Sequence, residues 1–140
     1  YNVRMGDPEC QTILPILNTD LADIFIACVD EKLDKIKINW KSKKSLCVVL
    51  CSNGYPDDYE KNVTINNFDK LILNENNYLF HAGTRKRDNK IVAIGGRVLN
   101  FISLSNEFKN SRQNIHENLK KLDWKKGFYR KDIAFNVISK

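Results

Sequence analysis

The chain has 140 residues, of which 42% are hydrophobic and fourteen are aromatic (two Trp, five Tyr and seven Phe), enough for one domain with its own core. No apolar run approaches the roughly 20 residues of a membrane-spanning helix, so we expect no membrane partner. The formal net charge of +6 divides into −3 over residues 1–60 (seven Lys or Arg, ten Asp or Glu) and +9 over residues 61–140 (sixteen against seven). The basic second half could attract nucleic acid or a small phosphorylated substrate, or its lysines could simply keep the surface hydrated.

Four polar side chains crowd the start of the chain: Asn2, Arg4, Asp7 and Glu9. Asparagine and carboxylate oxygens suit a hard cation such as Mg²⁺, and arginine clamps carboxylates and phosphates. We interpret this stretch as part of an active-site rim. The alternative is a polar turn at residues 6–8 that leads into a helix.

Two helices are predicted in residues 1–40. One follows Pro8, and the second follows residues 18–20 (Asn-Thr-Asp), whose side chains can cap a helix. Apolar side chains recur at helical spacing on the second helix, and we expect them to face the core: Leu21, Ile24, Phe25 and Cys28.

Strand signals dominate from Trp40 onward. The apolar run at residues 46–50 predicts a buried strand that ends at the turn signal of residues 52–56. Further strands are expected at residues 78–84, 90–94 and 97–104, with residues 85–89 as the hairpin loop between the first two.

A last helix is predicted after Ser105, which can cap it. Its apolar face holds Phe108, Ile115, Leu119 and Leu122. Residues 129–133 are expected to return to the sheet. These elements together predict an α+β fold, in which a mostly antiparallel sheet carries flanking helices.

The four cysteines, Cys10, Cys28, Cys47 and Cys51, form no CxxC pair. On a strand, Cys47 and Cys51 would lie about 13 Å apart, too far for a disulfide or for one zinc ion. Each cysteine neighbours apolar residues, which indicates buried, reduced thiols in a cytoplasmic protein.

The strongest local candidate for a binding site is the sequence Gly95-Gly96-Arg97. Paired glycines let backbone N–H groups approach an anion, and arginine adds a bidentate donor. If neighbouring strands pair, Arg85 and Arg97 converge on one phosphate, and His81 adds a hydrogen bond. The alternative is that the glycines form a bulge at a strand bend.

Residues 124–131 (Trp-Lys-Lys-Gly-Phe-Tyr-Arg-Lys) interleave aromatic and cationic side chains, as single-stranded nucleic-acid binders do. A small basic domain that binds RNA or single-stranded DNA is therefore the alternative function. In the competing interpretation the aromatic residues anchor the core and the lysines are hydrated.

Five segments resemble, in the same order, the glycinamide ribonucleotide synthetase family, also called the phosphoribosylamine–glycine ligases. The segments are residues 2–11 (NVRMGDPECQ), 48–56 (VVLCSNGYP), 80–84 (FHAGT), 95–99 (GGRVL) and 129–133 (YRKDI). The first resembles the end of the family's ATP-grasp region, and the others resemble its C-terminal domain. The resemblance thus divides the chain into residues 1–39, with the end of the ATP-grasp region and connecting helices, and residues 40–140, the C-terminal ligase domain.

This resemblance implies an enzyme of purine biosynthesis that uses ATP and Mg²⁺ (or Mn²⁺). The carboxylate of glycine is phosphorylated, and the amine of 5-phosphoribosylamine attacks the acyl phosphate to give glycinamide ribonucleotide, ADP and phosphate. We expect a cytoplasmic monomer with no nucleic-acid partner. Because the family's nucleotide pocket precedes the matching segments, we expect this 140-residue piece to be inactive alone.

The resemblance also implies roles for single residues. Asn2 matches a metal ligand, and Arg4 matches a catalytic arginine beside the acyl phosphate. Asp7 and Glu9 match the loop on the glycine side, and residues 95–97 match the turn that helps to hold phosphoribosylamine. With the local candidates above, the predicted substrate-binding residues are Asp7, Glu9, His81, Arg85, Gly95, Gly96 and Arg97.

Overall fold

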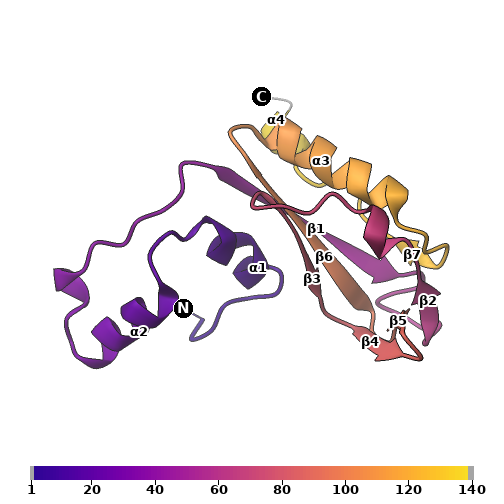
Figure 1. The fold of residues 1–140 in the computed structure, drawn as a ribbon, viewed down its shortest axis with the longest axis horizontal. Coiled ribbons are helices and arrows are strands. Elements are labelled where there is room, and N and C mark those ends of the chain that lie inside the picture. Colours follow the sequence, from indigo (N-terminus) through magenta and orange to yellow (C-terminus); the bar gives the residue numbers. More distant parts are fainter. Residues whose placement is uncertain (1, 139–140) are drawn as a thin grey trace.

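The computed structural model describes residues 2–138, which form two β-sheets with helices around them (Figure 1). The strands are β1 Lys44–Ser52, β2 Val63–Ile65, β3 Asn77–His81, β4 Thr84–Arg87, β5 Lys90–Ala93, β6 Arg97–Ser105 and β7 Gly127–Phe128. One sheet has the strand order β3–β6–β1–β7 and the other has the order β2–β5–β4, with every pairing antiparallel. The predicted α+β fold with a mostly antiparallel sheet is confirmed.

Helices lie on both faces of the four-stranded sheet (Figure 1). The α-helices are α1 Glu9–Ile13, α2 Leu21–Val29, α3 Phe108–Lys121 and α4 Phe135–Ile138, and the 3-10 turns are η1 Leu14–Ile16, η2 Leu33–Lys35 and η3 Phe68–Lys70. The long helix α3 packs against β1 and β6, with α4 beside it. The short helix α1 contacts the same two strands from the other side.

Alternating side chains of β1 give the sheet two different faces. Leu46, Val48 and Leu50 are buried and form the core with Phe101 of β6, beneath the apolar side of α3. Cys47 and its alternate neighbours point the other way, towards the start of α1. We call these two surfaces the α3 face and the α1 face.

A β-bulge interrupts the pairing of β1 with β6. Leu50 pairs with Leu99, but the next residue, Cys51, pairs with Arg97, so Val98 is the extra residue. Residues two apart on a strand normally share a face. Because of the bulge, Leu99 is buried in the core on the α3 face, whereas Arg97 lies on the α1 face.

The hairpin loop is shorter than predicted. β3 ends at His81 and pairs with β6, after which the chain crosses into the second sheet. Residues 85–87, predicted as loop, lie in strand β4 and pair with β5 through a turn at Asp88 and Asn89. Both turn residues have positive φ angles, 47° and 59°, which is typical of the two-residue hairpin turn that follows the twist of the strands.

Residues 18–39, which include α2, form an arm that extends away from the sheets (Figure 1). Its base is closed by backbone hydrogen bonds, in which Asn18 N donates to Asn39 O over 3.0 Å. As predicted, an acidic cap begins α2, because the Asp20 carboxylate accepts a hydrogen bond from Ala22 N over 2.8 Å.

The prediction that α2 faces the core is wrong. Phe25 is 60% exposed and Cys28 is also exposed, and Ala27 is the buried residue of the helix. The helical spacing of apolar residues reveals an apolar face but does not say what covers it. Among the described residues, no helix is both long and apolar enough to cross a membrane.

Candidate functional site

The polar N-terminal segment folds into a turn that leads into α1. Gly6 N donates a hydrogen bond to Glu9 Oε2 over 2.7 Å, and Gln11 Nε2 donates to Asp7 Oδ1 over 2.8 Å. The second carboxylate oxygen of Asp7 lies 3.2 Å from Arg97 Nη2 on β6. This ion pair joins the N-terminal segment to the residue after the paired glycines, two parts of the chain that the sequence analysis placed in one site.

A cavity of about 510 Å³ opens beside this ion pair, on the α1 face of the sheet. Its walls come from the N-terminal segment, from β1 and β6, and from the chain after β7. The lining residues are Pro8, Cys47, Val49, Cys51, Tyr55, Arg97, Phe128, Tyr129, Arg130 and Ile133. The cavity is therefore apolar and aromatic on most sides, with two guanidinium groups among its described lining residues.

Two thiols lie on the wall formed by β1. Burial raises the pKa of Cys47 to about 11, against a smaller opposing effect of a hydrogen bond with Thr12. Burial also raises the pKa of Cys51, although the charge of Arg97 acts in the opposite direction. Both thiols are therefore protonated near neutral pH, and neither has the character of a nucleophile.

The paired glycines serve close packing. Gly95 N donates to Gly83 O over 3.1 Å, so this amide is already used inside the fold. Ser52 closes the other side, since its N donates to Gly96 O over 2.8 Å and its hydroxyl donates to Gly95 O over 2.7 Å. The predicted anion contact through the Gly95 amide is thus unavailable in this arrangement, and the guanidinium of Arg97 is the donor next to the cavity.

Tyr55 is a neighbour of the glycine pair that the sequence analysis missed. It follows Gly54, whose φ of 103° makes the sharp turn after β1. A Cβ atom on Gly96 would lie 2.1 Å from Tyr55 Cδ2, so only glycine allows the tyrosine ring to pack there. The predicted turn at residues 52–56 was the available signal, but nothing in the sequence showed what the turn would contact.

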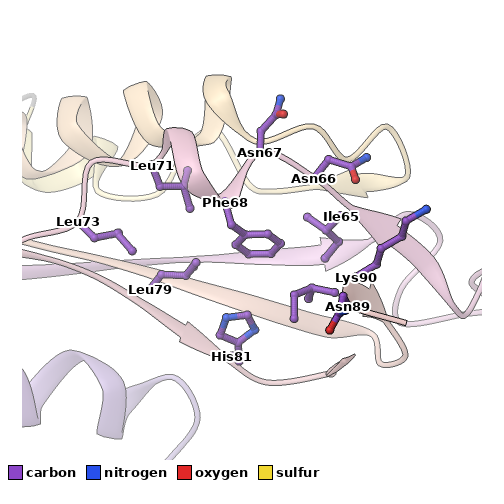
Figure 2. Close-up of a pocket in the computed structure, with 11 residues that line it drawn as sticks. Ile65, Asn66, Asn67, Phe68, Leu71, Leu73, Leu79, His81, Asn89 and Lys90 are labelled. Atoms are coloured by element: carbon purple, nitrogen blue, oxygen red, sulfur yellow. The ribbon is translucent and has the colours of Figure 1, made fainter. Parts of the chain in front are cut away.

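His81 lies on the other side of the sheet from Arg97. It pairs with Leu99 on the α3 face and lines a separate cavity of about 500 Å³ (Figure 2). Its ring stacks on Phe68 with 5.6 Å between ring centroids, and its Nδ1 lies 3.0 Å from Thr84 Oγ1. The structure therefore does not bring His81 and Arg97 together on one anion.

Arg85 is also separate from the cavity at Arg97. It lies exposed on β4 of the second sheet, opposite Val92. In the part of the chain that the structure describes, no ion pair or hydrogen bond joins its side chain to Arg97.

Asn2 and Arg4 lie exposed at the start of the described chain. The contact of Arg4 is a long one, from Nη1 to the Met5 carbonyl oxygen at 3.5 Å. Residues 2–138 contain no group of three His, Cys, Asp or Glu side chains that could hold a metal ion. The Asn2 amide oxygen has the chemistry of a single ligand for a hard cation, and not of a complete site.

Two aromatic residues of the basic tract at 124–131, Trp124 and Tyr129, lie in or against the core, whereas Phe128 is 37% exposed and lines the cavity. Trp124 is 8% exposed and belongs to the core cluster, so its ring cannot stack on a nucleotide base. Lys126 Nζ lies 3.4 Å from a carboxylate oxygen of Glu60, and Arg130 donates two hydrogen bonds, of 3.1 and 2.6 Å, to Asp132. Trp124 and the two cations fit the interpretation of a core anchor with cations at the surface, which does not extend to Phe128.

Comparison with known proteins gives consistent matches over the chain. Residues 45–136 match the family model described as "Phosphoribosylglycinamide synthetase, C domain". The phosphoribosylamine–glycine ligase of Brucella melitensis is 41% identical over 140 residues, which are all of this chain and 33% of that protein. The bifunctional purine biosynthetic protein ADE1 of Schizosaccharomyces pombe is 43% identical over 139 residues, which are 99% of this chain and 17% of that protein.

A solved structure agrees with these matches. The crystal structure of a phosphoribosylamine–glycine ligase from Thermotoga maritima superposes with a TM-score of 0.71 at 32% sequence identity, over 96% of this chain and 32% of that one. This chain thus spans about a third of the length of the single-function ligases that it matches. The matched domain, the shared fold and the ordered motifs agree, and the chain belongs to the phosphoribosylglycinamide synthetase C-domain family.

Proposed function

We propose that this chain is the C-terminal part of an ATP-dependent ligase that joins glycine to 5-phosphoribosylamine. The products are glycinamide ribonucleotide, ADP and phosphate. Residues 1–39 would be the end of the ATP-grasp region with its connecting helices, and residues 40–140 the C-terminal domain. Two of the relatives named above, from Brucella melitensis and Thermotoga maritima, are named phosphoribosylamine–glycine ligases, and this chain matches about a third of their length, so the 140-residue piece should be inactive alone.

The observation that carries the proposal is the ion pair between Arg97 and Asp7 beside the cavity that Arg97 lines. Guanidinium groups bind phosphate through two parallel hydrogen bonds, and Arg97 is presented beside a cavity whose volume suits a small substrate. Arg97 would bind the phosphate of phosphoribosylamine, and Gly95 and Gly96 would hold Arg97 in place through their close packing. His81 lies on the opposite face and has no part in this proposal. A substrate-binding role of Arg85 remains a prediction from the sequence.

The N-terminal segment would line the glycine side of the reaction. Arg4, which is exposed and has no carboxylate partner among the described residues, is available to neutralise charge on the acyl phosphate. The carboxylates of Asp7 and Glu9 suit the ammonium group of glycine. Formation of the acyl phosphate makes chemical sense because a carboxylate does not otherwise react with an amine at neutral pH.

Magnesium or manganese would enter this reaction with ATP. Asn2 would supply one oxygen ligand, and the other ligands would come from ATP and from residues outside this chain. The bound metal would neutralise the negative charge that builds on the transferred phosphoryl group. We also propose that the protein is a monomer and that it lies in the cytoplasm, and the four free thiols support the second of these statements.

A chimera tests the proposed function. In the Brucella melitensis ligase, the third of the chain that matches residues 1–140 is replaced by this chain, and product formation is measured with ATP, glycine and phosphoribosylamine. The chimera should form glycinamide ribonucleotide with all three substrates required, whereas the 140-residue chain alone should form none. A chimera that folds and binds ATP but makes no product would contradict the proposal, as would turnover by the 140-residue chain.

A further inference from the structure

The cavity on the α1 face has a second cation, Arg130, to which the sequence analysis assigned no role in binding a phosphorylated substrate. Of the described residues that line it, Arg97 and Arg130 are the ones that carry charge. Arg97 comes from β6, whereas Arg130 comes from the segment after β7, so the two guanidinium groups reach the cavity from separate elements. The rest of the described lining is apolar, aromatic or thiol, with Tyr55 among the aromatic residues.

Both guanidinium groups are occupied by carboxylates of the chain itself. Arg97 lies 3.2 Å from Asp7, and Arg130 lies 2.6 Å from Asp132. The four side chains are between 42% and 71% exposed, so solvent screens both ion pairs. A phosphate dianion that contacts both arginines therefore competes with weak partners.

The charges argue for a dianion. One guanidinium neutralises only half of a phosphate monoester, which carries close to two negative charges at neutral pH. Two guanidinium groups on one cavity match that charge, and each can donate two hydrogen bonds to a different edge of the phosphate. The Tyr55 hydroxyl has no hydrogen-bond partner among the described residues, so it is free to bind a hydroxyl group of the ligand.

From this geometry we infer that Arg130 is a second phosphate-binding residue, and that the cavity takes a sugar phosphate clamped between Arg97 and Arg130. Asp7 and Asp132 would be displaced when the ligand binds. This inference rests on the proposed function for the choice of a sugar phosphate, but it concerns a residue to which that proposal gives no role.

Titration of the 140-residue chain with ribose 5-phosphate, followed by ³¹P NMR, tests the inference. Arg130→Gln and Arg97→Gln should each weaken binding by about tenfold or more, because each removes a charge-assisted contact. Lys125→Gln is the matched control, since it removes one positive charge from the same exposed tract without lining the cavity, and it should bind within about twofold of the unaltered chain. The inference is overturned if Arg130→Gln binds normally, or if the unaltered chain shows no saturable binding.

Alkylation of the thiols gives a second readout inside the same molecule. Cys51 lines the cavity opposite Arg97, whereas Cys28 lies exposed on the arm. Ribose 5-phosphate should slow the alkylation of Cys51 and leave that of Cys28 unchanged, and Arg130→Gln should remove this protection. Equal protection of both thiols, or of neither, would contradict a ligand in this cavity.

The chimera separates failure of this inference from failure of the proposed function. In an active chimera, Arg130→Gln should raise the KM for phosphoribosylamine by about tenfold while the KM values for ATP and glycine stay unchanged. If the chimera is active and Arg130→Gln leaves the KM for phosphoribosylamine unchanged, only the role of Arg130 is overturned. An inactive chimera whose isolated chain still binds ribose 5-phosphate through both arginines overturns the proposed function alone.

Discussion

The two faces of the four-stranded sheet share the same strands but are covered very differently. The α3 face carries the fourteen-residue helix α3 and a core that includes Phe101 and Leu99, which are 2% and 0% exposed. The α1 face carries a helix of five residues and leaves the cavity at Arg97 open. Because the α3 face already holds the fold together, side chains on the α1 face are free to be selected for what they bind.

The largest expected effect is a difference in stability loss between two phenylalanine substitutions on opposite faces of the sheet. Phe101→Ala should lower the free energy of unfolding by about 3–5 kcal/mol, because it leaves a void in the core on the α3 face. Phe80→Ala is the matched change on the α1 face, where the ring is 37% exposed. This substitution should lower the free energy of unfolding by roughly 1–2 kcal/mol. Urea unfolding measures both, and similar losses would show that the faces do not differ as described.

A smaller effect is expected where the glycine pair supports the α1 face. Gly96→Ala forces a methyl group against the Tyr55 ring and should lower the free energy of unfolding by about 1–3 kcal/mol. Gly6→Ala is the control, because its Cβ would meet the movable carboxylate end of Glu9 at 2.9 Å. If the tyrosine is the cause, Gly96→Ala should do less harm in a Tyr55→Ala background, and an unchanged loss would refute this explanation.

The thiol on the α1 face should make stability depend on pH in the alkaline range. The pKa of Cys47 is raised from 9.0 to about 11 in the folded chain, so the unfolded chain loses this proton first as pH rises. Stability should therefore fall between pH 9 and pH 11, by roughly 2 kcal/mol. Cys47→Ala should remove this part of the pH dependence, as measured by urea unfolding at pH 8 and pH 10.5, and identical pH dependence in both chains would contradict the burial of the thiol.

The smallest effect is expected at the ion pair of the α1 face. A double-mutant cycle with Asp7→Asn and Arg97→Gln should give a coupling energy of only about 0–1 kcal/mol, because the two side chains are 42% and 44% exposed. The coupling should shrink in high salt. A value well above this range would mean that the pair stabilises the fold itself and is not readily exchanged for a ligand.

Much of the sheet could be predicted from the sequence, because periodicity and turn chemistry report local structure. The strand at residues 46–50 and the capped helix after Asp20 lie where these signals place them. The predicted helix after Ser105 is present as α3, but Ser105 is not its cap, because the N-cap is Glu107 and no side chain caps the helix. The strand at residues 85–87 was missed because charged side chains in a short exposed strand look like a loop. The predicted orientation of Phe25 was wrong because the sequence pattern of a helix does not show what packs against its apolar face.

The candidate site was less predictable, because it depends on which side chains share a face. The proximity of Asp7 and Arg97 followed from motifs of one family, whereas the separation of His81 from Arg97 depends on one extra residue in β6. Arg130 lies in the basic tract and in the segment YRKDI, but neither pattern predicted a phosphate contact, since its place beside the cavity comes from how the chain returns after β7.

The bulge at Val98 also determines which face of the sheet Arg97 of β6 lies on. Deletion of Val98 would leave Arg97 opposite Cys51 on the α1 face, because Arg97 would then directly precede Leu99. A residue inserted into β1 between Leu50 and Cys51 would instead pair with Val98, restore regular alternation, and turn the guanidinium of Arg97 into the hydrocarbon layer beneath α3. A single-codon insertion at this position of β1 in a related sequence, with no compensating change in β6, would therefore remove the proposed phosphate-binding cation from this cavity.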